Sequence, residues 1–147
     1  MFACGVDLVG MSSLVTVMDR APAYWKLSLP YFYKYYGDPA NPEDRRRLEA
    51  QSPIHRADRV IRPLLVIHGA NDVRVDRQES EKMVEALRQA GKDVEYLEFP
   101  DEGHGRDFGN WKNAVRLYRA MERFLARHLG GRTSAYDYID LAALLNF

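Results

Sequence analysis

Two loops of this 147-residue sequence hold residues whose types could do chemistry together. Asp72 follows the mostly apolar run 64–68, and His104 follows the run 94–99. A carboxylate beside an imidazole fixes the tautomer of the ring. It also stabilises the cation that forms when the ring takes a proton from a nucleophile. The pair is therefore a candidate acid and general base of a catalytic triad.

Each of these two residues also has a simpler explanation. An aspartate after a strand often forms a turn or caps a helix, and a single histidine in a loop is often incidental. Their joint placement after consecutive apolar runs favours the catalytic interpretation. His68 lies inside a run and is expected to be structural, whereas His55 and His128 are expected at the surface or as helix caps.

The runs before the two loops predict parallel strands. Residues 63–67 are continuously apolar and rich in branched side chains, as in a strand that is covered on both faces. Between the runs, apolar residues recur at helical spacing over about 78–90, and Gly91 ends that helix. A strand–helix–strand order implies a right-handed crossover, which would bring Asp72 and His104 to the same edge of the sheet.

Further elements extend this alternation on both sides. A short apolar strand is predicted at 2–9, a helix at about 42–50 and a last helix at about 111–128. Residues 12–37 are rich in aromatic side chains and interrupted by prolines, which predicts irregular structure with one or two short helices. The order of elements predicts an α/β fold with three layers, α/β/α, around a mostly parallel sheet.

The composition narrows the expected partners and cofactors. Lys+Arg and Asp+Glu number 21 each, so nothing favours a nucleic acid or an anionic membrane as a partner. No stretch reaches the ~18 apolar residues of a membrane span, and no signal peptide is visible, so a cytoplasmic location is expected. The single cysteine, Cys4, is expected to be a small buried residue. No cluster of metal ligands and no phosphate-binding glycine loop is visible, so no cofactor is expected.

Several runs resemble the prolyl oligopeptidase family of serine peptidases, in particular its bacterial dipeptidyl- and acylaminoacyl-peptidase-like members. Residues 65–75 are similar to the family's acid-bearing loop and residues 99–105 to its histidine loop, and 78–83 and 86–96 are similar to the segments between these loops. Residues 124–132 are similar to the end of the catalytic domain. Residues 2–6 and Tyr24-Trp25 are similar to the stretch after the nucleophile helix. The resemblance implies the last strands of an α/β-hydrolase fold and a peptide substrate. It also implies that Asp72 is the triad acid and His104 the general base.

The family places a serine nucleophile on a Gly-x-Ser-x-Gly elbow that precedes the acid in the sequence. Residues 1–72 contain no such motif. The nearest match surrounds Ser12 and Ser13, which lack the second glycine. We therefore expect residues 1–132 to be the C-terminal part of a catalytic domain that lacks its nucleophile and is inactive alone. Residues 133–147 are expected to form a tail with an apolar helical end.

Three functions stay open from the sequence. The chain could be a piece of a serine peptidase, a non-catalytic module for binding or dimerisation, or a hydrolase completed by a partner that supplies the serine. Without the elbow strand, the edge of the strand at 2–9 would be exposed, so self-association through that edge or marginal stability is expected. The aromatic residues 24–36 either line a substrate pocket or pack in the core or an interface, and the second is favoured.

Overall fold

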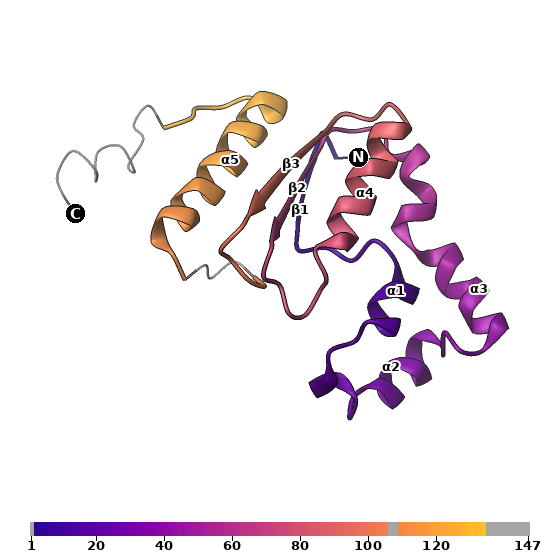
Figure 1. Cartoon of the computed structure of the whole chain (residues 1–147). Coiled ribbons are helices and arrows are strands. Elements are labelled where there is room, and N and C mark those ends of the chain that lie inside the picture. Colours follow the sequence, from indigo (N-terminus) through magenta and orange to yellow (C-terminus); the bar gives the residue numbers. More distant parts are fainter. Residues whose placement is uncertain (1, 106–108, 135–147) are drawn as a thin grey trace.

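A parallel sheet of three strands forms the centre of the computed structural model, which describes residues 2–105 and 109–134 (Figure 1). The strands β1 (Gly5–Leu8), β2 (Leu64–Gly69) and β3 (Val94–Phe99) lie side by side in the order β1-β2-β3. Each strand is parallel to its neighbour, as the alternation of strands and helices predicted. All three carboxyl ends therefore meet at one edge of the sheet.

Helices cover both faces of this sheet. The crossover helix α4 (Gln78–Gln89) joins β2 to β3, and α5 (Trp111–Leu129) follows β3. Figure 1 places α4 and α5 on opposite sides of the strands, so the predicted α/β/α layering is confirmed. None of the helices in the described part of the chain is long and apolar enough to cross a membrane.

Alternate residues of each strand face the two helical layers, because successive side chains of a strand point to opposite faces. On one face, Leu65 and Ile67 of β2 form a buried cluster with Leu117 and Phe124 of α5. On the other face, a second cluster joins residues of α4 to the turn before β2: Met83, Leu87 and Ala57, with Leu64 packed against them. Burial on both faces explains why β2 is continuously apolar up to Ile67.

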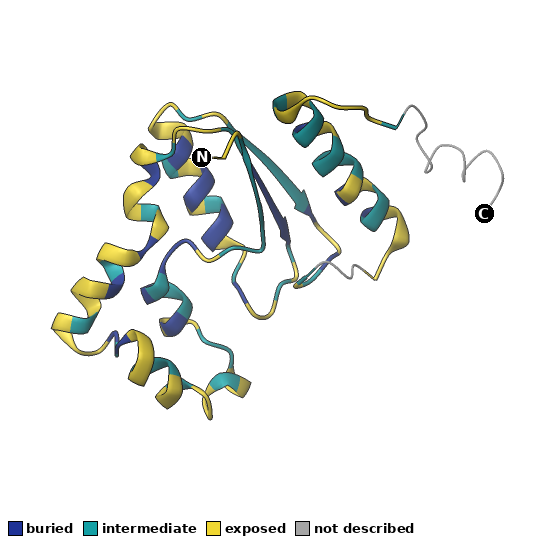
Figure 2. Ribbon diagram, turned by 180° about the vertical axis from the view of Figure 1, so that it is seen from behind, coloured by how far each residue is buried: buried dark blue, intermediate teal, exposed yellow. Residues whose placement is uncertain are grey.

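The aromatic segment before β2 contains two short α-helices, within the one or two that its sequence predicts. It forms α1 (Leu14–Asp19), a 3-10 turn η1 (Ala23–Trp25) and α2 (Leu29–Tyr36), and it is followed by α3 (Pro42–Gln51) and η2 (Pro53–Arg59). A third buried cluster joins α1 to α3 through Val15, Met18 and Leu48. The outer surfaces of α2 and α3 are largely exposed (Figure 2).

Several sequence predictions need correction. The strand predicted at 2–9 is shorter, because Val9 adopts a positive φ of 54° and the chain turns away from the sheet. Cys4 is only partly buried, since it packs against the rim of the core under α5. His128 is partly exposed, and its ring packs against Phe124 with ring centroids 4.6 Å apart. The predicted apolar tail from residue 135 onward lies outside the described residues.

A buried carboxylate fastens the segment after β1 to helix α4. The Oε2 atom of Glu79 accepts hydrogen bonds from the backbone amide and the hydroxyl of Ser12, at 3.1 and 2.8 Å, and from the amide of Ser13 at 2.8 Å. Its Oε1 atom accepts from the hydroxyl of Thr16. A buried charge is tolerated only with such donors around it. Glu79 therefore ties the start of α1 to the start of α4.

We expect the substitution Glu79→Gln to lower the free energy of unfolding by about 1–3 kcal/mol, because its amide group would face donors that need an acceptor. Urea denaturation measures this loss. The matched control is Glu81→Gln on the same helix, where the side chain is 40% exposed and lies 3.6 Å from Arg77. The control should cost less than about 1 kcal/mol. Equal losses in the two variants would contradict the anchoring role.

A second acidic side chain lies in the sheet itself. Asp7 pairs with Val66 in the register of β1 and β2, which places its side chain on the same face as His68. Burial raises the pKa of the Asp7 carboxyl, and the charge interaction with His68 lowers it in part. The folded chain therefore holds a proton on Asp7 at a higher pH than the unfolded chain does.

This shift predicts a dependence of stability on pH. The pKa of Asp7 is raised above its ordinary value of 3.8 in the folded state. Ionisation of this carboxyl therefore lowers the free energy of unfolding as the pH rises from below 3.8 through the raised pKa. Asp7→Asn removes that cost. The free energy of unfolding of the Asp7→Asn chain, relative to that of the parent chain, should therefore be higher at about pH 7 than at a pH below 3.8, the ordinary pKa of the carboxyl. Urea denaturation at both pH values tests this, and a difference that does not change with pH would contradict it.

Candidate active site

The loops after β2 and β3 touch at the carboxyl edge of the sheet. The amide of Ala70 donates to the carbonyl of Phe99 at 2.9 Å, and the amide of Asn71 donates to the carbonyl of Glu102 at 2.9 Å. Gly69 permits this approach, because a Cβ atom there would lie 2.3 Å from the carbonyl oxygen of Gly103. The last residue of β2 is therefore a glycine for a steric reason.

This contact brings Asp72 and His104 together. The Nδ1 atom of His104 lies 2.7 Å from the Oδ2 atom of Asp72. The Asp72 side chain is 0% exposed and the His104 side chain 25% exposed. Since an ionised carboxylate only accepts, Nδ1 is the donor. The Nε2 atom of His104 has no hydrogen-bond partner among the described residues, so it is the nitrogen that could face a reacting group.

The second oxygen of Asp72 is bonded to its own loop. Its Oδ1 atom accepts from the backbone amides of Arg74, at 2.8 Å, and Val75, at 3.0 Å. An aspartate that closes a turn in this way is also a common turn former, as the sequence analysis considered. In this loop the turn and the contact with His104 use different oxygens of one carboxylate, so both interpretations of Asp72 hold at once.

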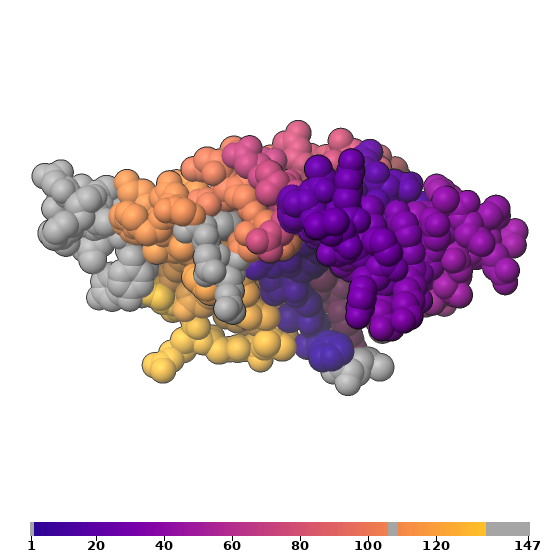
Figure 3. All heavy atoms as spheres, turned by 90° about the horizontal axis from the view of Figure 1, so that it is seen from below, coloured from indigo at the N-terminus to yellow at the C-terminus, as the bar shows by residue number. Residues whose placement is uncertain are grey.

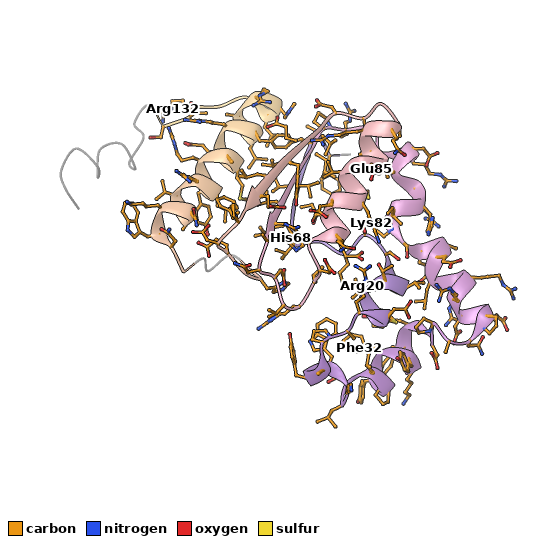
Figure 4. The ribbon with its side chains drawn as sticks, in the orientation of Figure 1. Arg20, Phe32, His68, Lys82, Glu85 and Arg132 are labelled. Carbon is orange, nitrogen blue, oxygen red and sulfur yellow. The ribbon has the colours of Figure 1, made fainter. Side chains whose placement is uncertain are left out.

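His68 lies on the side of the sheet that α4 covers, where its Nδ1 atom is 2.7 Å from the Ser80 hydroxyl oxygen (Figure 4). Its Nε2 atom lies 3.0 Å from the carbonyl oxygen of Val75 and 3.3 Å from Oδ2 of Asp72. The prediction that His68 is structural missed its contact with Asp72. The signal available in the sequence was the spacing of four residues across a tight turn, which by itself is a weak one.

The loop that carries His104 is anchored by a second residue that the sequence analysis did not single out. The buried Glu102 accepts hydrogen bonds from the amides of Gly109 and Asn110, at 3.0 and 3.2 Å, and from the Asn113 side chain at 2.7 Å. These donors lie at and inside the start of α5. Glu102 therefore joins the chain on one side of His104 to the chain on its other side.

The serines nearest to an elbow motif have structural partners. Ser12 donates its hydroxyl to Glu79, and the Ser13 hydroxyl accepts from the amide of Thr16 at 3.3 Å and caps α1. Both residues are buried. Among residues 2–105 and 109–134, no group of three or more His, Cys, Asp or Glu side chains is placed to hold a metal ion.

The aromatic segment splits into an inner and an outer part. Its inner side chains line an apolar cavity of about 150 Å³ between α1 and α2. The residues that line this cavity include Met11, Leu14, Val17, Trp25 and Phe32. The outer ones, including Tyr31 and Tyr35, are exposed. Figure 3, which shows the face at the carboxyl ends of the strands, places this purple segment next to orange atoms from around residue 100. The segment that lines the cavity and the loop after β3 therefore lie at the same end of the molecule.

Comparison with known sequences agrees with this geometry. The sequence profile of the prolyl oligopeptidase family matches residues 1–132. Dipeptidyl aminopeptidase BIII of Pseudoxanthomonas mexicana is 43% identical over 131 residues, which cover 89% of this chain and 19% of that protein. Dipeptidyl peptidase family member 6 of Caenorhabditis elegans is 40% identical over 137 residues, which cover 92% of this chain and 18% of that protein.

A solved structure shares the arrangement of the chain in space. The puromycin-hydrolyzing peptidase of Mycobacterium tuberculosis aligns with a TM-score of 0.81 and 27% identity, over 92% of this chain and 20% of that one. The chain thus spans about a fifth of the length of the relatives that it matches. On the match over residues 1–132 and the shared fold, this chain belongs to the prolyl oligopeptidase family of serine peptidases.

Proposed function

We propose that this chain is the part of a serine peptidase domain that supplies the triad acid, Asp72, and the general base, His104. The distance of 2.7 Å between His104 Nδ1 and Asp72 Oδ2 carries the proposal. With its Nδ1 proton held by the carboxylate, the neutral ring has a lone pair on Nε2, which is what a general base needs.

The proposed chemistry is acyl transfer to a serine. The Nε2 atom of His104 takes the hydroxyl proton as the serine oxygen attacks the carbonyl carbon of the peptide bond. The buried carboxylate of Asp72 stabilises the imidazolium that forms. His104 then gives the proton to the departing amine, and a water molecule activated by the same nitrogen hydrolyses the acyl-enzyme.

The serine in this proposal comes from outside these 147 residues. Residues 1–72 contain no Gly-x-Ser-x-Gly motif, and the hydroxyls of Ser12 and Ser13 are bonded to other partners. The relatives are about five times as long as the matched part, so they have room for the elbow and for further domains. Without a nucleophile and its oxyanion donors, the chain alone does not hydrolyse peptides or esters.

The proposed substrate is a peptide with an apolar side chain near the bond that is cleaved. Two of the relatives are named as dipeptidyl peptidases, which supports a peptide. The apolar lining of the cavity between α1 and α2 supports an apolar side chain, because a polar group would lose its hydration there without gaining partners.

A second candidate function is a module for self-association, and the open side of β1 favours it. The amide of Gly5 donates to Pro63 and the amide of Val9 to Ile67, so these alternate residues are paired with β2. In a parallel ladder the intervening amides point to the opposite side. No strand of the described chain pairs with that side, because β1 is an edge strand.

The peptidase proposal predicts the outcome of labelling with a fluorophosphonate probe, which reacts with activated serines. The pure 147-residue chain should not be labelled, because it lacks an activated serine. The protein encoded when the reading frame is extended upstream of the Met1 codon should contain a Gly-x-Ser-x-Gly motif and be labelled there. Labelling of Ser12 or Ser13 in the short chain would contradict the proposal.

In the extended protein, Asp72→Asn should lower kcat by about 10⁴, because the amide would hold the wrong tautomer of His104. The matched control is Asp76→Asn, in the same loop, whose carboxylate lies 3.0 Å from Arg20 on the surface. This control should keep kcat close to that of the parent. A similar loss in both variants would argue against a specific role for Asp72.

The open side of β1 predicts that the 147-residue chain forms dimers or larger species as its concentration rises. Size-exclusion chromatography with light scattering over a range of concentrations measures this. Val6→Pro keeps an apolar side chain against the core but removes one of the intervening amides on the open side of β1, so it should return the chain to a monomer. A folded monomer at every concentration would count against the self-association module and leave the peptidase proposal intact.

A further inference from the structure

We infer that His68 is a positioning residue for the triad acid: its buried imidazole lies between helix α4 and the Asp72 carboxylate and holds that carboxylate in the orientation that His104 needs. The inference rests on the proposed role of Asp72. It assigns to His68 a task in the site, where the sequence indicated only a residue of the core.

The surroundings of the ring determine where its proton lies. The Nε2 atom faces the carbonyl oxygen of Val75 at 3.0 Å and the Oδ2 atom of Asp72 at 3.3 Å. A carbonyl and an ionised carboxylate can only accept hydrogen bonds, so Nε2 carries a proton in either charge state of the ring. The N–H bond donates to the Val75 carbonyl, and Oδ2 of Asp72 lies 3.3 Å from the same nitrogen.

Helix α4 holds the other side of the ring. The Nδ1 atom of His68 lies 2.7 Å from the hydroxyl oxygen of Ser80, and the hydroxyl donates to Nδ1 when the ring is neutral. His68 is 0% exposed and Ser80 1% exposed. Because both ring nitrogens have partners in a closed space, the ring cannot flip without losing them. The position of α4 is thus transmitted through Ser80 and His68 to the loop of Asp72.

His68 acts on the acid by two routes. One is the electrostatic contact of its Nε2 atom, at 3.3 Å, with Oδ2, the oxygen that accepts from His104. The other route runs through Val75, whose carbonyl accepts from His68 while its amide donates to Oδ1 of Asp72 at 3.0 Å. The residue that closes the turn around the carboxylate is therefore itself held by the imidazole.

Other charged groups on this face leave that assignment unchanged. Asp7 on β1 shares the face with His68, and Glu98 on β3 is paired with His68 in the register of the strands. Glu98 accepts from the Tyr96 hydroxyl at 3.1 Å and lies 3.6 Å from Arg77. In the described part of the chain, neither carboxylate is hydrogen-bonded to the His68 ring. The two ring nitrogens are bonded to Ser80 and Val75 instead.

A histidine that only filled the core would affect stability and nothing else. A positioning histidine also affects the tautomer of His104, because a well-oriented Asp72 selects the Nδ1–H form of that ring. Nitrogen-15 chemical shifts of labelled histidines report this tautomer directly in the 147-residue chain, without any need for activity. In the unmutated chain, neutral His104 should be almost entirely in the Nδ1–H form.

The test compares three variants of the labelled chain. His68→Leu removes both ring nitrogens and should lower the ratio of the Nδ1–H to the Nε2–H form of His104 roughly fivefold to tenfold. His68→Gln can keep an N–H near the position of Nε2 and should restore much of that ratio. Val66→Ala, a buried change on the same strand and face, should lower stability without changing the ratio.

The outcomes separate this inference from the proposed function. A folded His68→Leu chain with the parental tautomer ratio would overturn the positioning role and leave the Asp72–His104 pair in place. A mixture of tautomers already in the unmutated chain would overturn that pair, and the inference with it. Where His68→Leu does not fold, Ser80→Ala takes its place. Freeing one side of the ring should lower the ratio about twofold, and an unchanged ratio would overturn the inference.

Discussion

A carboxylate removed from water is stable only when polar partners surround both of its oxygens, and Asp72 meets this condition with three hydrogen-bond donors and a second imidazole close by. Two backbone amides approach Oδ1, and the imidazoles of His104 and His68 approach Oδ2. These partners come from the loop after β2, the loop after β3 and β2 itself. Any shift of one strand against the other would leave the buried charge short of donors, so the sheet and the site stabilise each other.

The same device recurs at this end of the molecule. Glu79 accepts hydrogen bonds from groups at the start of α1, and Glu102 accepts hydrogen bonds from groups at the start of α5. With Asp72 these residues form a set of buried carboxylates, each of which joins a loop at the carboxyl ends of the strands to another segment of the chain. Loops are ordinarily the least constrained parts of a fold. In this chain their positions are set by charged groups that are costly to leave unpaired.

The proposed acid and base thus meet within a chain that covers about a fifth of its relatives' length. Their geometry depends on β2, β3, α4 and α5, all of which lie in the described residues. The strand β1 holds neither residue of the pair, and its outer side is unpaired within the described residues. Catalysis by the family's serine mechanism needs the nucleophile beside this pair, whereas the pair itself forms without it.

Much of this arrangement could be predicted from the sequence, because strand and helix patterns are local. The apolar run before Asp72, the helical spacing after it and the family motifs predicted the parallel order of the strands and the meeting of Asp72 with His104. The roles of Glu79, Glu102 and His68 could not be found in this way. Their partners lie on other elements, and whether a polar side chain is buried with donors or faces water depends on how those elements pack. The sequence by itself determined which loops carry the proposed acid and base. The tertiary structure decided how each is held, because a hydrogen bond between distant residues exists only once the sheet and its helices have brought its donor and acceptor within about 3 Å.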